Sequence, residues 1–264
     1  MIVTVVKVFV KEGYAEDFIK ATVEVDYRYF RAYEGYNSAG VLKSISGVTP
    51  TISQTRATFR TQAMANGAGW HQTDWNLLNA VQILALIEFN DFKIPEYIGL
   101  GNSEGADYGI VTGGTNILGN FSSSYSENTY MSYRGIENWY GDIWEFIDGI
   151  NIQAPRLVYL NENYTTFTDD TYTGDYVSTG ITVPASTGSY ISKMNNLSNG
   201  FLPLSVSNSS SSTFVGDAFY ADEDGTIALF GGNAGNGLLD GPFCLSLGTV
   251  SSNSYVRIGS GVSF

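Results

Sequence analysis

Four carboxylates stand among large aromatic side chains in residues 131–152, and they are the residues best suited to chemistry. They are Glu137, Asp142, Glu145 and Asp148. A glycosidase needs two carboxyl groups that face each other across a sugar cleft. The alternative is a structural role, in which Arg134 pairs with Glu137 or Asp142. Asp148 would then form a turn with Gly149. We favour the structural role and predict no catalytic residue.

The remaining reactive side chains occur singly. His71 is the only histidine, which excludes a zinc site built from several histidines. We expect it to be packed or to cap the following helix, because no nucleophile motif accompanies it. Cys244 is the only cysteine, which excludes an intrachain disulfide and a metal site of several cysteines. We expect Cys244 to be a small buried residue of a strand.

The acidic stretch from Asp222 to Gly225 is the candidate cation site. Carboxylate oxygens bind hard cations such as Ca²⁺, but four residues supply too few ligands for one. Acidic residues before a glycine more often form a hairpin turn, and we predict a turn here. We therefore expect no metal and no cofactor.

Composition limits the classes of partner. The 264 residues carry a net charge of −13, and after Arg156 the only basic residues are Lys193 and Arg257. Nucleic acids and anionic membranes are recognised by clustered Lys and Arg, so neither is an expected partner. No apolar run reaches the length of a membrane span, and no signal peptide is evident. Export would then occur by lysis, by assembly into a particle, or with a leader outside this sequence.

The surface chemistry points outside the cell. Only 15% of the residues are charged, while 43% are hydrophobic and 14% are aromatic. The surface must therefore consist largely of Ser, Thr, Asn, Gln and Tyr, which suits an extracellular, virion or lectin-like protein.

The first 26 residues are predicted to be an extension of one strand and one helix. Residues 1–10 are rich in β-branched side chains, and residues 15–25 place apolar side chains at helical spacing. The strand is a plausible edge for pairing between chains, so a homo-oligomer is possible. The remaining residues, 27–264, are predicted to form one ligand-binding domain.

Two helices are predicted early in this domain. The first opens near Arg56, continues through Phe59 and Ala63, and ends at Asn66-Gly67. The second runs from Trp75 to about residue 90, with Thr73 or Asp74 as its N-cap. It is apolar nearly all round, so we expect it to be covered on both sides.

The rest of the chain is predicted to consist of short strands and long loops. Residues 99–126 are expected to be loop, and residues 131–152 a turn and a short helix through Trp139 and Ile143. A strand is expected at 150–152 and another at 157–160. In the last fifty residues, apolar pieces at 227–230, 243–247 and 256–258 alternate with loops rich in Gly, Asn and Ser.

These segments carry a family resemblance. The order is Gly69-Trp-His, the apolar helix, Tyr133-Arg-Gly-Ile-Glu-Asn-Trp-Tyr-Gly, Gly231-Gly and a final Ile258-Gly. Residues 27–264 resemble the C-type lectin-like fold of the formylglycine-generating-enzyme type. More narrowly, they resemble phage and prophage tail or receptor-binding proteins, including variable proteins diversified by retroelements. The resemblance implies an α+β fold with two helices, small irregular antiparallel sheets and long loops.

The resemblance also implies a C-terminal face that meets a receptor. Tyr offers rigid contact area there, and Asn and Ser offer adaptable hydrogen bonds. The alternative is that these residues merely form turns. The implied ligand-binding residues are Phe219, Tyr220, Asp222, Asn233, Asn236, Leu238, Asp240, Asn253, Ser254 and Tyr255.

The resulting hypothesis is a non-enzymatic tail-associated adhesin, located in the virion or at a cell surface. Its expected partners are a host-surface glycan or protein and other virion subunits. One alternative is a carbohydrate-active or oxidase-like enzyme on the same fold. The formylglycine-generating activity needs two cysteines, and this sequence has one. The other alternative is a purely structural virion subunit.

Overall fold

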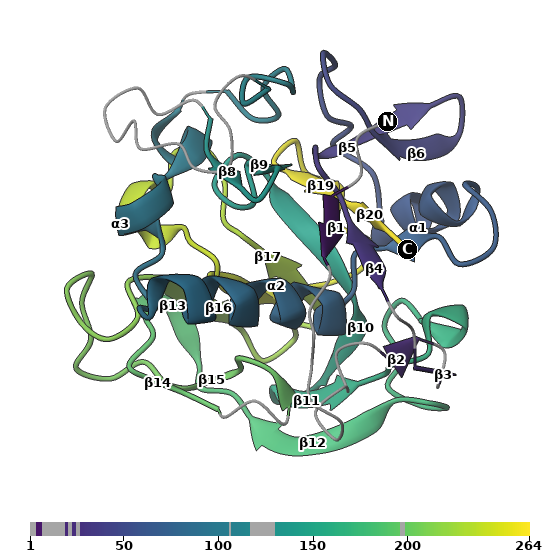
Figure 1. Ribbon diagram of the computed structural model, residues 1–264. Coiled ribbons are helices and arrows are strands. Elements are labelled where there is room, and N and C mark those ends of the chain that lie inside the picture. Colours follow the sequence, from purple (N-terminus) through teal and green to yellow (C-terminus); the bar gives the residue numbers. More distant parts are fainter. Residues whose placement is uncertain are drawn as a thin grey trace.

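A computed structural model describes residues 27–105, 107–116, 130–195 and 199–264, together with three short strands in the first 26 residues. The largest element is a curled sheet of eight strands (Figure 1). Seven of them follow the order β12-β11-β10-β17-β18-β16-β13, and β19 pairs with β10. Their bounds are β10 (Trp144–Gln153), β11 (Leu157–Leu160), β12 (Val177–Thr182), β13 (Ser186–Tyr190), β16 (Ala218–Ala221), β17 (Ile227–Phe230), β18 (Leu245–Thr249) and β19 (Ile258–Ser260).

The two outer strands of this order are consecutive in the chain, and this explains the curl. Only residues 183–185 separate β12 from β13. A link of that length reaches about 14 Å at most. In a flat sheet the two outer strands would be about 29 Å apart. The sheet must therefore bend until its two edges approach each other. Most of its pairs are antiparallel, but β10 with β19 and β16 with β18 are parallel.

Helix α2 (Trp75–Phe89) packs on one face of the sheet. Its N-cap is Asp74, whose side chain accepts from the Leu77 backbone N–H, and its C-cap Asn90 is left-handed. The main core cluster joins α2 to strand residues that include Phe219, Phe230 and Leu245. The prediction of this helix and of its N-cap is confirmed.

Helix α1 (Arg56–Met64) packs on the other face of the sheet. Phe59 and Ala63 join Phe146, Leu229 and neighbouring apolar residues in a second core cluster. The helix begins after Thr55, which caps it, so the predicted position is confirmed. A third helix, α3 (Pro95–Ile98), is a single turn.

Smaller strand pairs surround this centre. The first and last described parts of the domain lie together, because Tyr29 and Phe264 exchange both backbone hydrogen bonds, at 3.0 and 3.1 Å. The Phe264 ring also packs edge-on against Trp70. The pairs are β1 (Thr4–Val6) with β4 (Arg28–Phe30), β2 (Ile19–Lys20) with β3 (Val23–Glu24), β5 (Gly35–Ser38) with β6 (Val41–Ser44), β7 (His71–Gln72) with β20 (Val262–Ser263), β8 (Ser132–Tyr133) with β9 (Ile136–Glu137), and β14 (Lys193–Met194) with β15 (Pro203–Ser205).

The predicted fold class is wrong. An α+β fold with two helices and small antiparallel sheets was expected, but the protein is mostly β, with one large mixed sheet and only short helices besides α2. Strands β12 and β13 are rich in Ser, Thr and Gly and largely exposed, so they carry no apolar alternation to reveal them.

Two local predictions are also wrong. The short helix expected in residues 131–152 is absent, and β10 occupies Trp144 to Gln153 instead. Nine of its ten residues are buried, and a strand buried on both faces shows no period of two. In the first 26 residues, positions 19–20 and 23–24 are strands, where a helix was expected. The other residues of that predicted helix lie outside the described residues, as do residues 117–129.

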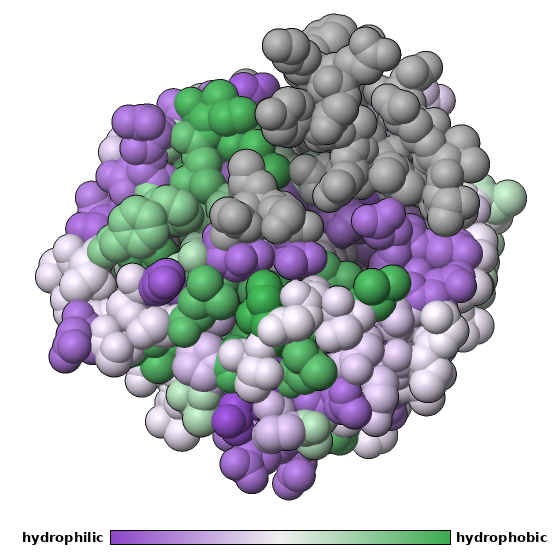
Figure 2. Space-filling view, turned by 90° about the horizontal axis from the view of Figure 1, so that it is seen from below, coloured by the Kyte–Doolittle hydropathy of each residue, from purple (hydrophilic) through white to green (hydrophobic). Residues whose placement is uncertain are grey.

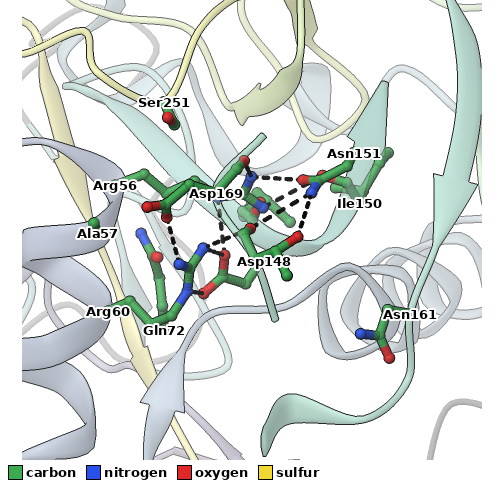
Figure 3. A network of polar contacts seen from close by, with 12 residues as sticks. Arg56, Ala57, Arg60, Gln72, Asp148, Ile150, Asn151, Asn161, Asp169 and Ser251 are labelled. Carbon is green, nitrogen blue, oxygen red and sulfur yellow. Dashed lines mark hydrogen bonds and ion pairs between the residues drawn. The ribbon is translucent and has the colours of Figure 1, made fainter. Parts of the chain in front are cut away.

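A buried polar network holds α1 against β10 (Figure 3). The pairing of β10 with β17 shifts register between Ile147 and Asn151, and this bulge leaves backbone carbonyls free. The Arg56 guanidinium donates to the carbonyl oxygens of Ile147 (2.7 Å) and Ile150 (3.3 Å). Its Nε lies 2.9 Å from Asp148 Oδ1. Arg60, one turn later in α1, donates to both oxygens of the same carboxylate, at 2.6 and 2.8 Å.

Apolar and polar residues are mixed on the surface of the protein. On the face that Figure 2 shows, apolar residues of the described part lie in small groups among polar ones.

Among the described helices, none combines the length and the hydropathy that crossing a bilayer requires.

The network predicts unequal costs for two arginine substitutions. Arg56→Ala removes the arginine donor of two buried carbonyls and one of the two cations beside the buried Asp148, so it should lower the free energy of unfolding by about 3–5 kcal/mol. Arg134→Ala removes a surface pair with Glu88 and should cost about 0–1 kcal/mol. Urea unfolding of the purified variants measures both. Equal, small losses would contradict the central role of Arg56.

Candidate functional site

A pocket of about 340 Å³ opens on the face of the sheet that α1 covers only in part. Five of the ten residues predicted to bind a ligand line it: Tyr220, Asn233, Asn236, Asn253 and Tyr255. The other lining residues are Trp144, Leu229, Ser246, Gly248, Thr249, Arg257 and Ile258.

Strand geometry explains the floor of the pocket. Tyr220 on β16 and Leu229 on β17 both stand opposite Ser246 on β18, so the three side chains form one row across the sheet. Side chains alternate between the two faces of a strand. The neighbours of these residues, such as Phe219 and Leu245, therefore point into the core beneath α2.

Trp144 and Asn233 fix one wall. Trp144 is buried at the start of β10 and packs edge-to-face against the Tyr220 ring, with the ring centroids 5.9 Å apart. With its amide oriented to satisfy both groups, Asn233 accepts from the Trp144 indole N–H at 2.6 Å and donates to the Ala234 carbonyl at 2.6 Å. The wall is thus preorganised by contacts within the protein.

The rim consists of residues 249–257, of which 252 and 254–257 are exposed. Tyr255 has 54% of its surface exposed. The Arg257 guanidinium lies over its ring, 5.8 Å from the centroid, at a distance typical of cation–π contacts. The Asn253 amide donates to the Thr249 hydroxyl. Aromatic, amide and cationic groups therefore surround the opening.

Asp170 anchors this rim to the rest of the protein. Its carboxylate accepts from the backbone N–H of Ser251 (3.2 Å) and from the hydroxyls of Ser251 and Thr226. Burial alone would raise the pKa of Asp170. The hydrogen bonds from Ser251 and Thr226 lower it by more, so the pKa of this carboxyl lies below its usual value. The neighbouring Asp169 pairs with Arg60, which ties the rim to the network beneath α1.

The hydroxyl of Tyr220 remains a neutral donor. Burial raises its pKa to about 12, and the nearby Cys244 and Asp240 raise it as well. At neutral pH the pocket therefore offers hydroxyl and amide hydrogen bonds together with one charge, that of Arg257.

The other five predicted residues lie elsewhere. Phe219 is fully buried on the opposite face, because it precedes Tyr220 in the same strand. Asp222 and Ser254 are exposed outside the pocket lining. Leu238 and Asp240 line a second pocket of about 270 Å³. The loop of residues 231–240 separates the two pockets.

This loop passes close over Asp240. Gly232 has a φ of +85°, and a Cβ there would lie 1.5 Å from Asp240 Oδ1. Any other residue would force the loop away from the carboxyl, so glycine is required at this position.

The acidic stretch from Asp222 is a turn, but it does not make a hairpin. Residues 223 and 224 form the turn between β16 and β17. Those two strands are not paired with each other, since β18 lies between them. In the described part of the chain, no group of three or more His, Cys, Asp or Glu residues could hold a metal ion.

The four carboxylates of residues 131–152 are engaged within the protein. Asp142 accepts from Asn102 (2.7 Å) and from two backbone N–H groups of residues 109–110 (3.0 Å each). Glu137 accepts from the backbone at 113 and 115 and from the Thr115 hydroxyl. Glu145 lies 2.7 Å from Arg31 Nε, and Asp148 is bound by Arg56 and Arg60. The predicted pairing of Arg134 with Glu137 or Asp142 is wrong, because Arg134 pairs with Glu88.

His71 and Cys244 are buried. His71 Nε2 lies 2.7 Å from Asp74 Oδ2, and its Nδ1 lies 3.0 Å from the Gly69 carbonyl. Burial lowers the pKa of His71 despite the neighbouring carboxylate. Burial raises the pKa of the Cys244 thiol well above its usual value. The predictions of a packed histidine and of a buried cysteine are confirmed, but Cys244 lies one residue before β18 and not within a strand.

Sequence reasoning missed Trp144, Arg257 and the strand residues of the floor. Trp144 was assigned to a turn or helix, which hid the face to which it points. The sequence could have indicated Arg257, because it is one of only two basic residues after Arg156.

Comparisons with known proteins found similarity only at the level of solved structures. No protein-family model and no curated protein matches this sequence. A solved structure described as "Major Tropism Determinant P3c Variant" is similar with 14% identity and a TM-score of 0.38. The match covers 89% of this chain and 54% of that one, so this chain spans about half the length of that structure. A likeness at this TM-score does not establish a shared fold.

The second pocket gives a prediction for the pH dependence of stability. Burial raises the pKa of Asp217 from 3.8 to about 8, although the Phe243 backbone N–H partly opposes the shift. Between about pH 4 and pH 8, Asp217 therefore keeps its proton in the folded state and has lost it in the unfolded state. The contribution of Asp217 to the free energy of unfolding is fully present below about pH 4. It is lost as pH rises to about 8, at up to about 1.4 kcal/mol per pH unit.

Asp217→Asn should remove that contribution while keeping an oxygen for the Phe243 N–H. We expect the difference in unfolding free energy between variant and wild type to shift in favour of the variant as pH rises from 5 to 8. Chemical denaturation at several pH values measures it. A difference that stays constant across this range would contradict the raised pKa.

Proposed function

We propose that this protein is a non-enzymatic binding protein whose ligand occupies the larger pocket and its rim. By its sequence resemblance, it would be a phage or prophage tail-associated adhesin, in the virion or at a cell surface. Its ligand would be a host-surface glycan or protein.

The observation that carries this proposal is the convergence at the pocket. Five residues predicted from the sequence as display positions meet there, from three separate segments of the last fifty residues. Tyr220, Trp144 and Tyr255 give it rigid aromatic surface, and the Asn side chains give adaptable hydrogen bonds. This combination is typical of recognition surfaces. A volume of about 340 Å³ falls within the usual range of ligand sites.

The chemistry of the lining favours binding over glycoside hydrolysis. A glycosidase needs two carboxyl groups at the scissile bond. None of the residues that line this pocket is Asp or Glu. The carboxylates of residues 131–152 are bound to arginines, backbone N–H groups and side-chain donors elsewhere in the described structure.

The charge of the site bears on the class of ligand. Arg257 is the single cation of the lining, and the whole chain carries a net charge of −13. A polyanion such as nucleic acid would need several clustered cations. A neutral or weakly acidic ligand with hydroxyl and amide groups fits the lining better.

Two substitutions at the pocket test this proposal on arrays of host-surface glycans and proteins. Tyr255→Ala removes exposed aromatic area from the rim, and we expect about tenfold or greater loss of affinity for the ligand found. Tyr220→Phe removes only a hydroxyl and should cost about 2–10-fold. Val177→Ala is the control, because Val177 is also an exposed apolar residue (69%, against 54% for Tyr255) but lies on the edge strand β12.

Three outcomes decide among the alternatives. Loss of binding in both tyrosine variants, with the control unchanged, supports the pocket. Binding that neither tyrosine substitution affects would remove the pocket from the proposal. Turnover of a bound glycan would show an enzyme instead.

A further inference from the structure

The second pocket contains two buried carboxyl groups that the proposed function does not use. It is lined by Asp217 and Asp240, each 1% exposed, and by other residues of the segments 93–100, 211–217 and 238–240. Asp217 precedes β16, and Asp240 closes the loop of residues 231–240. Lys93 and Glu96 stand on the opposite side, where α3 begins.

Asp240 has an oxygen without a hydrogen bond. Its Oδ1 accepts from the Asn236 amide at 3.0 Å, while its Oδ2 is buried and accepts no hydrogen bond from the described residues. A buried polar atom left unsatisfied costs about 1–3 kcal/mol, and more if it is charged. Such an atom at the edge of a pocket calls for a donor supplied from outside the protein.

Neither carboxyl has a cation beside it. Asp217 accepts from the Phe243 backbone N–H at 2.6 Å, and in the described part of the chain neither aspartate makes an ion pair. Burial raises the pKa of Asp240 well above its usual value, although the nearby Asn236 amide, Ser103 hydroxyl and Asn233 backbone each lower it; the Asp217 carboxyl adds a smaller upward shift. The buried Cys244 thiol and the Tyr220 hydroxyl are further ionisable neighbours of these carboxyls.

Lys93 does not supply the missing charge. Its Nζ donates to the Ser212 carbonyl at 3.2 Å and lies 3.9 Å from a Glu96 carboxylate oxygen. The lysine is therefore held by other acceptors, and the two buried carboxyls face the pocket without a counterion.

We infer that this pocket binds the ammonium group of a small organic amine, with Asp240 Oδ2 and the Asp217 carboxyl as its acceptors. An ammonium group brings a positive charge and several N–H donors, which are the two features that these carboxyls lack. Leu100, Pro95 and Leu238 supply apolar surface for the carbon chain of such a ligand.

A metal ion fits the pocket less well. Ca²⁺ takes about six to eight oxygen ligands. Only two carboxyls meet at the pocket floor, and the described residues contain no larger acidic group that could hold a metal. The amine supplies its own hydrogen-bond geometry and needs no such shell.

The test is isothermal titration of the wild-type protein with propylammonium at pH 7.5 to 8.5, in two buffers of different ionisation enthalpy. We expect binding accompanied by proton release, because at least one raised-pKa carboxyl must ionise to meet the cation. Tetramethylammonium is the ligand control, since it has the charge but no N–H donor. It should bind about tenfold more weakly or not at all. Equal binding of the two cations, absence of propylammonium binding, or preferential binding of Ca²⁺ would each overturn the inference.

Matched variants locate the site. Asp240→Asn keeps the shape but removes the charge, and should weaken propylammonium binding by about tenfold or more. Glu223→Gln, at an exposed carboxylate outside the pocket lining, should change it by less than about threefold. Equal affinities of wild type and Asp240→Asn would overturn the assignment. If Asp240→Asn does not fold, the comparison of the two cations with the wild type still decides. Because the test uses no pocket-lining tyrosine, its outcome is independent of the proposed adhesin function.

Discussion

The position of helix α1 and of the rim of the larger pocket depends on the buried contact between Arg56 and Asp148. The bulge in β10 frees the carbonyls of Ile147 and Ile150, and such groups must find donors when they are buried. A guanidinium has five N–H donors in a rigid fork, so Arg56 donates to both carbonyls, to the Asn151 amide oxygen and to the Asp169 carbonyl while its Nε lies against the carboxylate. A lysine ammonium has only three N–H donors, which is fewer than the acceptors that surround Arg56. The bulge and helix α1 therefore specify each other, and the helix can occupy only one place on this face of the sheet.

That placement leaves part of the same face uncovered and supports its rim. From the Arg56 cluster, Arg60 reaches Asp169, and Asp170 next to it holds the backbone of the rim at Ser251. The floor of the larger pocket, which Tyr220, Leu229 and Ser246 form on β16, β17 and β18, then remains uncovered beside α1. The loop of residues 231–240 forms the boundary between this open floor and the second pocket. Because Asn236 lines one pocket and donates to Asp240 in the other, the two pockets share a structural element.

The elements that could be predicted from the sequence are those that a local apolar run or a helix-capping residue marks. Helix α2 and its cap Asp74 were predictable because an apolar run followed a capping residue. The strand at 227–230 was predictable from its apolar run between polar loops. Strand β10 was not, because it is buried on both faces and shows no alternation. Two of its three partners, β17 and β19, lie far away in the sequence, and the arginine at its bulge comes from helix α1. The fold class was wrong for the same reason, since long-range pairing and not local propensity builds the curled sheet.

The site was predictable as a set of residue types but not as a surface. Alternation along β16 places Tyr220 in the pocket and Phe219 in the core, and this depends on a register that the sequence does not state. The most direct test is hydrogen–deuterium exchange of the protein with and without the ligand that the arrays identify. The account predicts slower exchange in residues 231–240 and 249–257 on binding, with β12 unchanged. Protection confined to other segments, with none in these two, would contradict it.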